Sequence, residues 1–318
     1  MALVRRFGDF PLAYPMAVEP YLQAFGYGDG AIAYTQEAGF TFALGDPVAA
    51  PASTGPVLDA FVDRFRDPVF VASQRPTAAH LAARGYRVTV FGHDSVIQLR
   101  DFDFSGGAHK RIRYASSWLR ARGGTIVEHS AAGISKQEIA RLSRDWKASR
   151  VSSRELRFLS RSFSWKPEPE TRRFYAMSAE GKPLGLVGFD PIYEDGAIIG
   201  YLASQKRRQA DDTAYLDLAI MRQAIETFRD EGRRTVHLGI SPLAGIEPSG
   251  FRETAWLRRS LLKAHGSDWV NTRIFNSRGL STYKSRFRGA PLPLYLCLPP
   301  SGTGILRMAA LLVLLRVV

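Results

Sequence analysis

The chain has 318 residues, with 43 lysines and arginines against 30 aspartates and glutamates, so its formal net charge is +13. Apolar residues make up 45% and charged residues 23%, a globular composition that excludes a disordered or collagen-like chain. The single cysteine, Cys297, excludes a disulfide framework and indicates a reducing, cytoplasmic setting. No apolar stretch approaches the roughly 18 residues needed to cross a bilayer, and the N-terminus lacks a signal-peptide core, so we expect neither secretion nor membrane spans.

The positive charge is unevenly distributed. Residues 1–100 carry a net charge of −1, residues 101–200 carry +5 and residues 201–318 carry +9. Arginine supplies 35 of the 43 cations, and its guanidinium group favours forked contacts to phosphate. This distribution predicts a polyanionic partner, which could be tRNA, a phosphorylated cofactor or an anionic membrane. The alternative is a solvated basic surface.

The first part of the chain alternates strand-like and helix-like patterns. Apolar residues at Val57, Phe61 and Phe65 recur at helical spacing, and a basic helix follows Gly106 and ends before Gly123. The remaining expected elements are a hairpin over residues 31–36 and 39–44, strands over 69–73, 86–91 and 96–99, and a short helix over 76–84.

The second part repeats this logic. Ser135 and Glu138 form a capping box at the start of a helix that contains Trp146. Prolines in the last expected strand, residues 292–298, indicate a sheet edge. The other expected elements are strands over 173–179, 184–190, 197–202 and 235–238, and helices over 214–232, 251–264 and 277–287.

The shared order of elements predicts an α/β protein with a mixed sheet, built from tandem GNAT-like acyltransferase domains. We expect one domain over residues 1–130, a second over residues 131–300, and an apolar tail over residues 301–318. The order in the second half matches the GNAT fold, in which two sheet strands splay apart around the acyl-donor site.

Several site classes lack their sequence signals. GNAT enzymes that use acyl-coenzyme A carry a glycine-rich loop whose N–H groups hold the pyrophosphate. The equivalent stretch, residues 205–212, has no glycine and contains Lys206, Arg207 and Arg208, which disfavours coenzyme A. The six histidines show no metal-ligand spacing, and neither a G-x-S-x-G elbow nor a P-loop is present. Cys297 lies in an apolar strand and is interpreted as a packed core thiol.

An ordered set of motifs resembles the catalytic domain of the phosphatidylglycerol lysyltransferase (aminoacyl-phosphatidylglycerol synthase) family. The motifs extend from about residue 20 to residue 298. They are Leu44-Gly45-Asp46-Pro47, Lys110 with Arg113, Asp145-Trp146, Leu238-Gly239-Ile240-Ser241-Pro242-Leu243, Tyr283-Lys284-Ser285-Arg286-Phe287 and Leu294-Tyr295-Leu296.

The resemblance implies transfer of an aminoacyl group from aminoacyl-tRNA, as co-substrate and without another cofactor, to a phosphatidylglycerol-like membrane lipid or a related hydroxyl or amine acceptor. Family members often carry a multi-span flippase, so this chain resembles a freestanding catalytic unit. It departs from the family where a D-L-x-R pattern is usual, because residues 200–203 read Gly-Tyr-Leu-Ala. The transferred amino acid and the acceptor therefore stay open.

Two residues are candidates for catalysis. Lys284 matches the family's lysine and is expected to hold phosphate or stabilise the tetrahedral intermediate; the alternative is a lysine on a helix surface. Asp145 is a candidate base or orienting group, and the alternative is a carboxylate paired near Lys147. His237, in a short buried strand, is interpreted as a core histidine rather than a general base.

The candidates for binding tRNA or substrate phosphate are all cations. Those in the basic helix have a solvated helix face as their alternative, while those near residue 207 occupy the place of a phosphate-binding loop. The set is Lys110, Arg111, Arg113, Arg207, Arg208 and Arg286.

The C-terminal tail is apolar except for Arg307 and Arg316. We expect residues 303–318 to form an interfacial helix beside anionic lipid, with the protein peripheral on the inner face of the cytoplasmic membrane. The alternative is a helix docked on the body of the protein or on another subunit.

Two other functions remain open at this point. The first is an acyl-coenzyme-A-dependent GNAT N-acyltransferase, and the second is a non-catalytic tandem domain that binds tRNA or membrane. No metal is expected for any of these functions.

Overall fold

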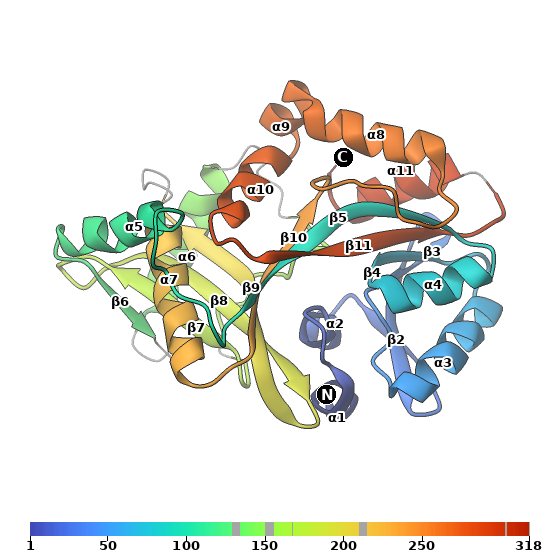
Figure 1. Cartoon of the computed structure of the whole chain (residues 1–318), viewed down its shortest axis with the longest axis horizontal. Coiled ribbons are helices and arrows are strands. Elements are labelled where there is room, and N and C mark those ends of the chain that lie inside the picture. Colours follow the sequence, from blue (N-terminus) through green and yellow to red (C-terminus); the bar gives the residue numbers. More distant parts are fainter. Residues whose placement is uncertain (129–133, 150–155, 167, 210–214, 303, 318) are drawn as a thin grey trace.

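The computed structural model describes all residues except 129–133, 150–155, 167, 210–214, 303 and 318. A single eleven-stranded sheet extends through the molecule in the order β1-β2-β3-β4-β11-β5-β10-β9-β8-β7-β6 (Figure 1). The strands are β1 (Gln23–Tyr27), β2 (Gly30–Glu37), β3 (Phe40–Leu44), β4 (Val69–Ser73), β5 (Arg87–Gln98), β6 (Thr125–Glu128), β7 (Arg172–Met177), β8 (Pro183–Glu194), β9 (Ala197–Arg208), β10 (Thr235–Pro242) and β11 (Ala290–Leu298).

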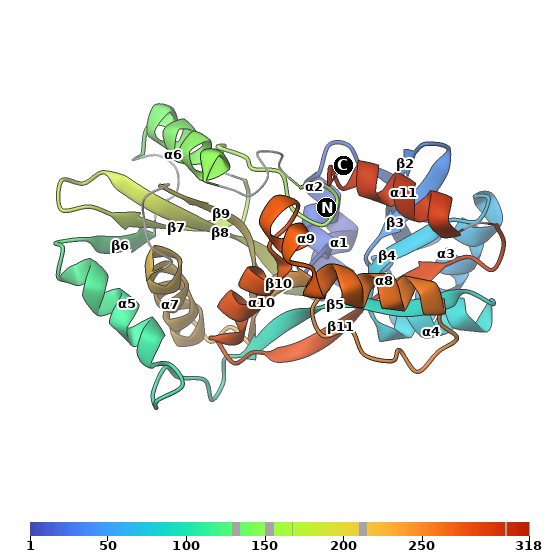
Figure 2. The ribbon, with the colours of Figure 1, turned by 90° about the horizontal axis from the view of Figure 1, so that it is seen from above.

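Helices cover both faces of this sheet. They are α1 (Ala2–Phe7), α2 (Ala13–Val18), α3 (Pro51–Arg64), α4 (Arg75–Ala83), α5 (Lys110–Arg120), α6 (Lys136–Ala148), α7 (Tyr215–Asp230), α8 (Ala255–Gly266), α9 (Asp268–Arg273), α10 (Ser277–Ser285) and α11 (Gly304–Leu314). Figure 2 shows α6 on one side of the second half of the sheet and α5 with α7 on the other.

Apart from the exposed edge strand β1, the first half of the sheet is buried on both faces. Its alternating residues pack on one side against α3 and α4, where Phe61 and Leu81 are fully buried. On the other side they pack against α1, α2, α8 and α11. Burial on both faces explains why strand residues 69–73 are an unbroken buried run.

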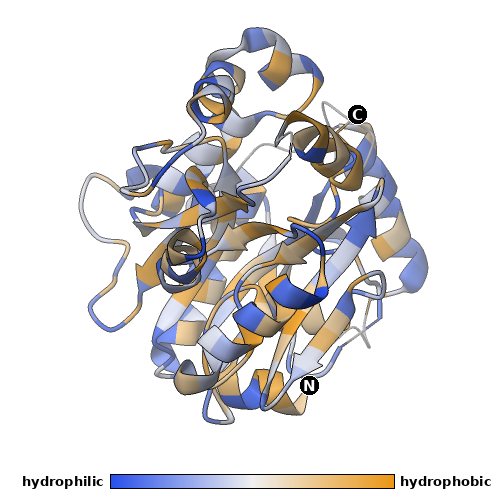
Figure 3. Cartoon of the chain, turned by 90° about the vertical axis from the view of Figure 1, so that its right-hand side faces the viewer, coloured by the Kyte–Doolittle hydropathy of each residue, from blue (hydrophilic) through white to orange (hydrophobic). Residues whose placement is uncertain are grey.

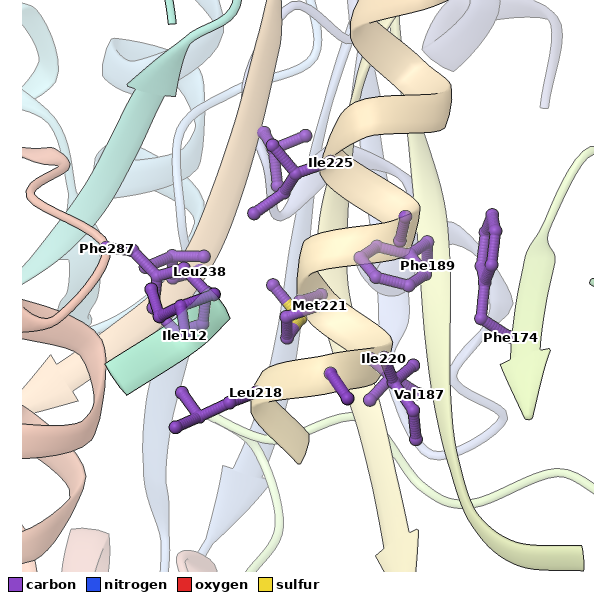
Figure 4. Packing of buried hydrophobic residues seen from close by; sticks show 14 of the residues in the cluster. Ile112, Phe174, Val187, Phe189, Leu218, Ile220, Met221, Ile225, Leu238 and Phe287 are labelled. Atoms are coloured by element: carbon purple, nitrogen blue, oxygen red, sulfur yellow. The ribbon is translucent and has the colours of Figure 1, made fainter. Parts of the chain in front are cut away.

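The core of the second half joins elements that are distant in sequence. Ile112 of α5, Met221 of α7, Leu238 of β10 and Phe287 after α10 meet in one cluster (Figure 4). The predicted capping box at the start of α6 is present, with Ser135 and Glu138 bonding each other's backbone N–H groups. This core fixes the position of α10 relative to β10, which matters for the site.

β9 and β10 separate in the middle of the sheet. They pair in parallel only from Gly200 with Thr235 to Leu202 with His237. Beyond that point β9 continues along β8 as far as Arg208, while β10 bulges between His237 and Ile240 and stays paired with β5. This separation is the splay expected of a GNAT-like half, and the tandem GNAT-like α/β fold is confirmed.

Three expectations from the sequence are wrong in detail. Residues 86–91 and 96–99 belong to one strand, β5, because its polar centre at Asp94 is buried between β10 and β11. Lys206–Arg208 are the end of strand β9 rather than a loop. Residues 292–298 do not form a sheet edge, because β11 lies between β4 and β5.

The prolines of β11 are tolerated for a local reason. Pro291 and Pro293 pair with β5 only, and pairing with β4 begins at Tyr295. The prolines thus lie where one side of the strand has no neighbour. Although β11 comes late in the sequence, it completes the first half of the sheet, and the predicted domain boundaries remain a prediction.

Candidate active site

The side chain of Lys284 reaches the place where β9 and β10 separate. Lys284 lies in the last turn of α10 and is 4% exposed. Its Nζ donates hydrogen bonds to the carbonyl oxygens of Gly239 at 2.6 Å and Ile240 at 2.7 Å. Gly239 has a φ of +80°, so glycine is favoured at this bulge. The lysine is therefore a buried group and not a helix-surface one.

Burial changes the acidity of this amine. Burial, together with the charge of Lys206, lowers the pKa of Lys284 to about 7, although Asp94 acts in the opposite direction. At neutral pH a large fraction of the side chain is then uncharged. A neutral amine has two N–H donors and one lone pair. The two carbonyls satisfy the donors, which leaves the lone pair able to accept a proton.

Asp94 forms a buried pair with His237. The Oδ2 atom of Asp94 lies 2.5 Å from Nδ1 of His237, and its Oδ1 accepts a hydrogen bond from the backbone N–H of Ser95 at 2.7 Å. Both side chains are buried. His237 is thus a partnered core histidine, as its sequence context indicates. Asp94 supplies negative charge close to Lys284.

A second lysine lies beside Lys284. Burial lowers the pKa of Lys206 to about 8, opposed by the charge of Asp217. Its Nζ lies 4.2 Å from the ring centroid of Tyr283. Because two buried like charges disfavour each other, the pair of lysines favours binding of an anion.

Arginines extend this positive region toward α5. Burial and the charge of Arg111 lower the pKa of Arg286. Arg111 lies 5.6 Å from the ring centroid of Tyr215, and Arg208 lies 3.8 Å from a carboxylate oxygen of Asp217. The structure therefore brings Lys284, Arg286, Arg208 and Arg111 together on the α5/α7 side. Guanidinium and ammonium groups gathered in this way are the groups that bind phosphate in proteins, so phosphate binding here stays a prediction.

The other candidates lie elsewhere. Arg113 donates to the carbonyl oxygens of Phe104 and Gly106, which holds the loop before α5. Lys110 is exposed at the start of α5. Asp145 lies on α6, across the sheet, with Arg141 at 3.8 Å.

Arg207 points to the α6 face of the sheet. It donates to Ser143 Oγ at 3.1 Å and stacks on Trp146 and Phe163 at 4.1 and 4.2 Å. These contacts give Arg207 a packing position. Catalytic or binding roles for Arg207, Arg113, Lys110 and Asp145 remain predictions.

Comparison with known proteins identifies the family. The family model described as phosphatidylglycerol lysyltransferase, C-terminal, matches residues 2–298. The chain belongs to this family. The resemblance found in the sequence motifs is thereby confirmed.

Relatives of known structure share the fold. The chain aligns with the structure of L-PGS from Bacillus licheniformis with a TM-score of 0.76 at 16% identity, covering 99% of this chain and 95% of that one. It also aligns with the C-terminal domain of a putative lysylphosphatidylglycerol synthetase from Agrobacterium fabrum, with a TM-score of 0.77 at 19% identity, covering 99% and 93%.

A curated sequence relative is much longer. The lysylphosphatidylglycerol biosynthesis bifunctional protein LysX of Nocardia farcinica is 26% identical over 185 residues, which are 57% of this chain and 14% of the relative. The matched region is thus a small part of that protein.

Gly200, where the usual family pattern has an acidic residue, lies close to Thr235 of β10. A Cβ atom at Gly200 would lie 2.4 Å from Thr235 Oγ1 and 2.5 Å from the Thr235 carbonyl oxygen, its partner on β10. Ala203 is buried in the core below the site. In this family member, an acidic side chain at position 200 has no room unless β10 moves.

Sequence reasoning did not select Asp94, Lys206 or Tyr283 as site residues. Asp94 stands out as an acid inside an apolar strand, and Lys206 shares one strand face with Arg208. The hydroxyl of Tyr283 is buried and has no hydrogen-bond partner among the described residues, and burial raises its pKa. Tyr283 lies next to Lys284 in the motif of residues 283–287, and this position in the sequence could have indicated that it belongs to the site.

Two further observations concern metals and membranes. Among the residues that the structure describes, no three His, Cys, Asp or Glu side chains are grouped to hold a metal ion. In the same residues, no helix is both long enough and apolar enough to span a bilayer.

Proposed function

We propose that this chain transfers an aminoacyl group from aminoacyl-tRNA to a hydroxyl of a phosphatidylglycerol-like lipid. Membership of the family supports this reaction class. The observation that carries it is the buried amine of Lys284 at the separation of β9 and β10, next to Lys206 and a group of arginines.

The reaction exchanges one ester for another. The lipid hydroxyl oxygen attacks the carbonyl carbon of the aminoacyl ester, and a new C–O bond forms. The bond to the tRNA ribose oxygen breaks, and this oxygen takes up the proton that the lipid hydroxyl loses. No oxidant, reductant or covalent enzyme intermediate is needed, because positioning of the two substrates supplies much of the rate.

Lys284 moves the proton in this proposal. Its uncharged form accepts the proton of the attacking hydroxyl, and its charged form stabilises the oxyanion before returning the proton to the ribose oxygen. The bonds to Gly239 and Ile240 hold the amine in place throughout. Burial and the charge of Lys206 keep the pKa of Lys284 near neutrality, where both transfers are possible.

The cations hold the tRNA end. Arg111, Arg208 and Arg286 lie on the α5/α7 side, and forked guanidinium contacts suit backbone phosphates. Lys110, exposed on the same helix as Arg111, extends this surface. Aminoacyl-tRNA is thus the proposed co-substrate, and no further cofactor is proposed.

The acceptor lipid places the reaction at a membrane surface. We assign the protein to the cytoplasmic side, peripheral on the inner face of the cytoplasmic membrane, with α11 in the 303–318 tail at the lipid. Residues 303 and 318 lie outside the described part of the tail. One face of α11 is buried on the protein, and the other face is exposed. Docking of the tail on the body and contact with lipid are therefore compatible.

A transfer assay tests the proposal. Purified protein, phosphatidylglycerol and tRNA charged with a labelled amino acid should give labelled lipid, and RNase treatment before the assay should abolish it. Parallel reactions with different charged tRNAs identify the amino acid. A reaction with labelled acetyl-coenzyme A in place of tRNA tests the acyl-coenzyme A alternative. Absence of lipid labelling with every charged tRNA would contradict the proposal.

A further inference from the structure

The outer face of α11 is an unbroken apolar stripe. Arg307, Ala310, Leu311 and Leu314 are buried on the body of the protein. Met308 also packs against this core, whereas Ile305 is 66% exposed. Figure 3 shows the helix that ends near the C-terminus coloured as hydrophobic over most of its length. The exposed positions before Arg316 are Ile305, Leu306, Ala309, Leu312 and Val313, which recur at helical spacing.

α8 lies beside α11 and adds to this surface. Leu257 of α8 and Leu311 of α11 are buried in the same core on one face of the sheet, so the outer sides of the two helices face the same way. Trp256 and Ile305 line one groove where the two helices begin. Both helices lie along the top of Figure 1 and face the viewer in Figure 2.

Exposed aromatic and basic residues complete the surface. Trp269 of α9 is 65% exposed, and Trp256 and Leu262 of α8 are also exposed. Residues 252–278 contain six arginines and lysines against two acidic residues. Both acidic residues are paired, Glu253 with Arg258 and Asp268 with Arg278. The cations without an ion pair among the described residues are Arg252, Arg259, Lys263 and Arg273.

We propose that α8, α9 and α11 form one docking face for an anionic lipid bilayer. Tryptophan, leucine and isoleucine side chains enter the boundary between headgroups and acyl chains, while arginine and lysine contact anionic headgroups. This inference rests on the proposed function, since it names the surface by which the enzyme reaches its lipid.

The charge of the face distinguishes a bilayer from other occupants. A second copy of this chain docked by two-fold symmetry would bring the same cations against each other, because such an interface is self-complementary. A nucleic acid would bind the arginines and lysines through its phosphates but would leave the apolar face of α11 exposed to water. An anionic bilayer satisfies both the apolar stripe and the cations.

A buried network connects the docking face to the site. Ser277 Oγ at the start of α10 lies 3.0 Å from His265 Nδ1 and donates to Asn271 Oδ1 at 3.1 Å, and Asn271 Nδ2 donates to the His265 carbonyl oxygen at 2.9 Å. These bonds join α8, α9 and α10 into one unit. Lys284 lies near the other end of α10, a helix about 13 Å long.

Vesicle binding tests this face with two variants. The first combines Ile305→Ser with Leu306→Ser, and the second combines Arg259→Glu with Lys263→Glu. All four side chains are exposed, so the fold should be kept. The matched control is Tyr27→Ser, since Tyr27 is an exposed aromatic residue on β1 in the first half.

We measure flotation with vesicles of phosphatidylcholine alone and of phosphatidylcholine mixed with phosphatidylglycerol. The serine variant should bind both less well, with a loss of about tenfold or more on the mixed vesicles. Addition of phosphatidylglycerol should increase vesicle binding of the wild type but not of the glutamate variant. The control should bind both kinds of vesicle as the wild type does. Unchanged vesicle binding by the serine and glutamate variants would overturn the proposal.

Two further measurements separate the alternatives. If the wild type is a dimer in solution and the serine variant is a monomer with normal vesicle binding, the face is an interface between copies and the proposal is overturned. A short-chain phosphatidylglycerol dissolved as monomers needs no docking, so both variants should transfer to it at the wild-type rate. Failure of the wild type itself on this substrate would contradict the proposed transferase function. The vesicle-binding measurements would still show whether α8, α9 and α11 bind the bilayer, because they do not depend on transfer activity.

Discussion

Lys284 Nζ lies 2.6 Å from the carbonyl oxygen of Gly239. The two residues are 45 positions apart, and they belong to two different motifs among those that resemble the family, residues 238–243 and 283–287. The bulge of β10 at Gly239 exposes carbonyls that the sheet does not use, and α10 places the lysine over them. The contact thus relates the two motifs: the motif around Gly239 supplies the carbonyl oxygens that accept hydrogen bonds, and the motif around Lys284 supplies the amine that donates them.

Replacement of Lys284 by methionine should remove catalysis and keep the fold. Methionine has similar length and needs no hydrogen-bond partner, so burial is preserved. We expect the rate of lipid labelling to fall about 10²-fold or more, the usual range for loss of a proton-transferring group. The Lys182→Met variant, in an exposed turn between β7 and β8, is the control. A Lys284→Met enzyme as active as that control would contradict the role of Lys284.

The pH dependence of the rate should report the Lys284 amine. If the uncharged amine accepts the proton, kcat/KM rises as pH increases through about 7, the pKa of Lys284. Lys206 lowers that pKa, so Lys206→Met should move the rise to higher pH. We would measure labelling rates from pH 6 to 9 in both proteins, taking these limits as roughly one unit below and two above that pKa. A rate that falls over this range would show that the charged form is the active one.

The stability of the protein should also depend on this amine. The pKa of Lys284 is about 7 in the folded protein, below its ordinary value of 10.5. The unfolded chain therefore binds more protons between these pH values, and the free energy of unfolding rises with pH across this window. Below pH 7 the full cost of burying the charge is present.

Lys284→Met removes that cost. The variant should be more stable than the wild type at pH 6, and the difference should shrink toward pH 10. Urea unfolding at several pH values measures it. Lys182→Met should differ from the wild type by the same small amount at every pH. A Lys284→Met effect that does not change with pH would show that the pKa of Lys284 is not lowered in the folded protein.

How much of this could be predicted from the sequence differs between elements. Local patterns located the capping box at Ser135, the basic helix and the buried strand at residues 69–73, because each depends on neighbouring residues. The position of β11 depends on pairing with strands more than 190 residues away, so its prolines suggested an edge that does not exist. Long-range pairing leaves no local signal.

The site shows the same division. The motifs around Gly239 and Lys284 selected the lysine that the structure buries, but Asp94 approaches it only because β5 and β10 are adjacent. Lys206 and Arg207 follow each other in sequence, yet β9 directs them to opposite faces. A run of cations interpreted as a loop could not show that alternation, which appears only in a strand.

Charge reversal at Arg111 should weaken tRNA binding with a salt signature. Arg111 and Arg286 lie close enough to affect each other, and an anion between them relieves that repulsion. Arg111→Glu should lower tRNA affinity, and the slope of log K against log salt should become smaller by about 1 for each phosphate that the protein no longer neutralises. Filter binding over a salt series measures both. The matched change Arg120→Glu, on an exposed position of the same helix, tests whether any charge on α5 has the same effect.

Substitution of Gly200 should be destabilising although no charge is introduced. A Cβ atom there would approach the Thr235 side chain and carbonyl within 2.5 Å, so Gly200→Ala forces β9 and β10 apart at the first of their three shared pairs. Overpacking of this kind costs about 1–3 kcal/mol, measurable by urea unfolding. Gly26→Ala is the control, since a Cβ atom on this β1 glycine would meet nothing within 4 Å. Because the strands separate next to Lys284, activity should fall as well. A Gly200→Ala protein as stable as the Gly26→Ala control would show that β10 can move, and that an acidic side chain could be accommodated at position 200.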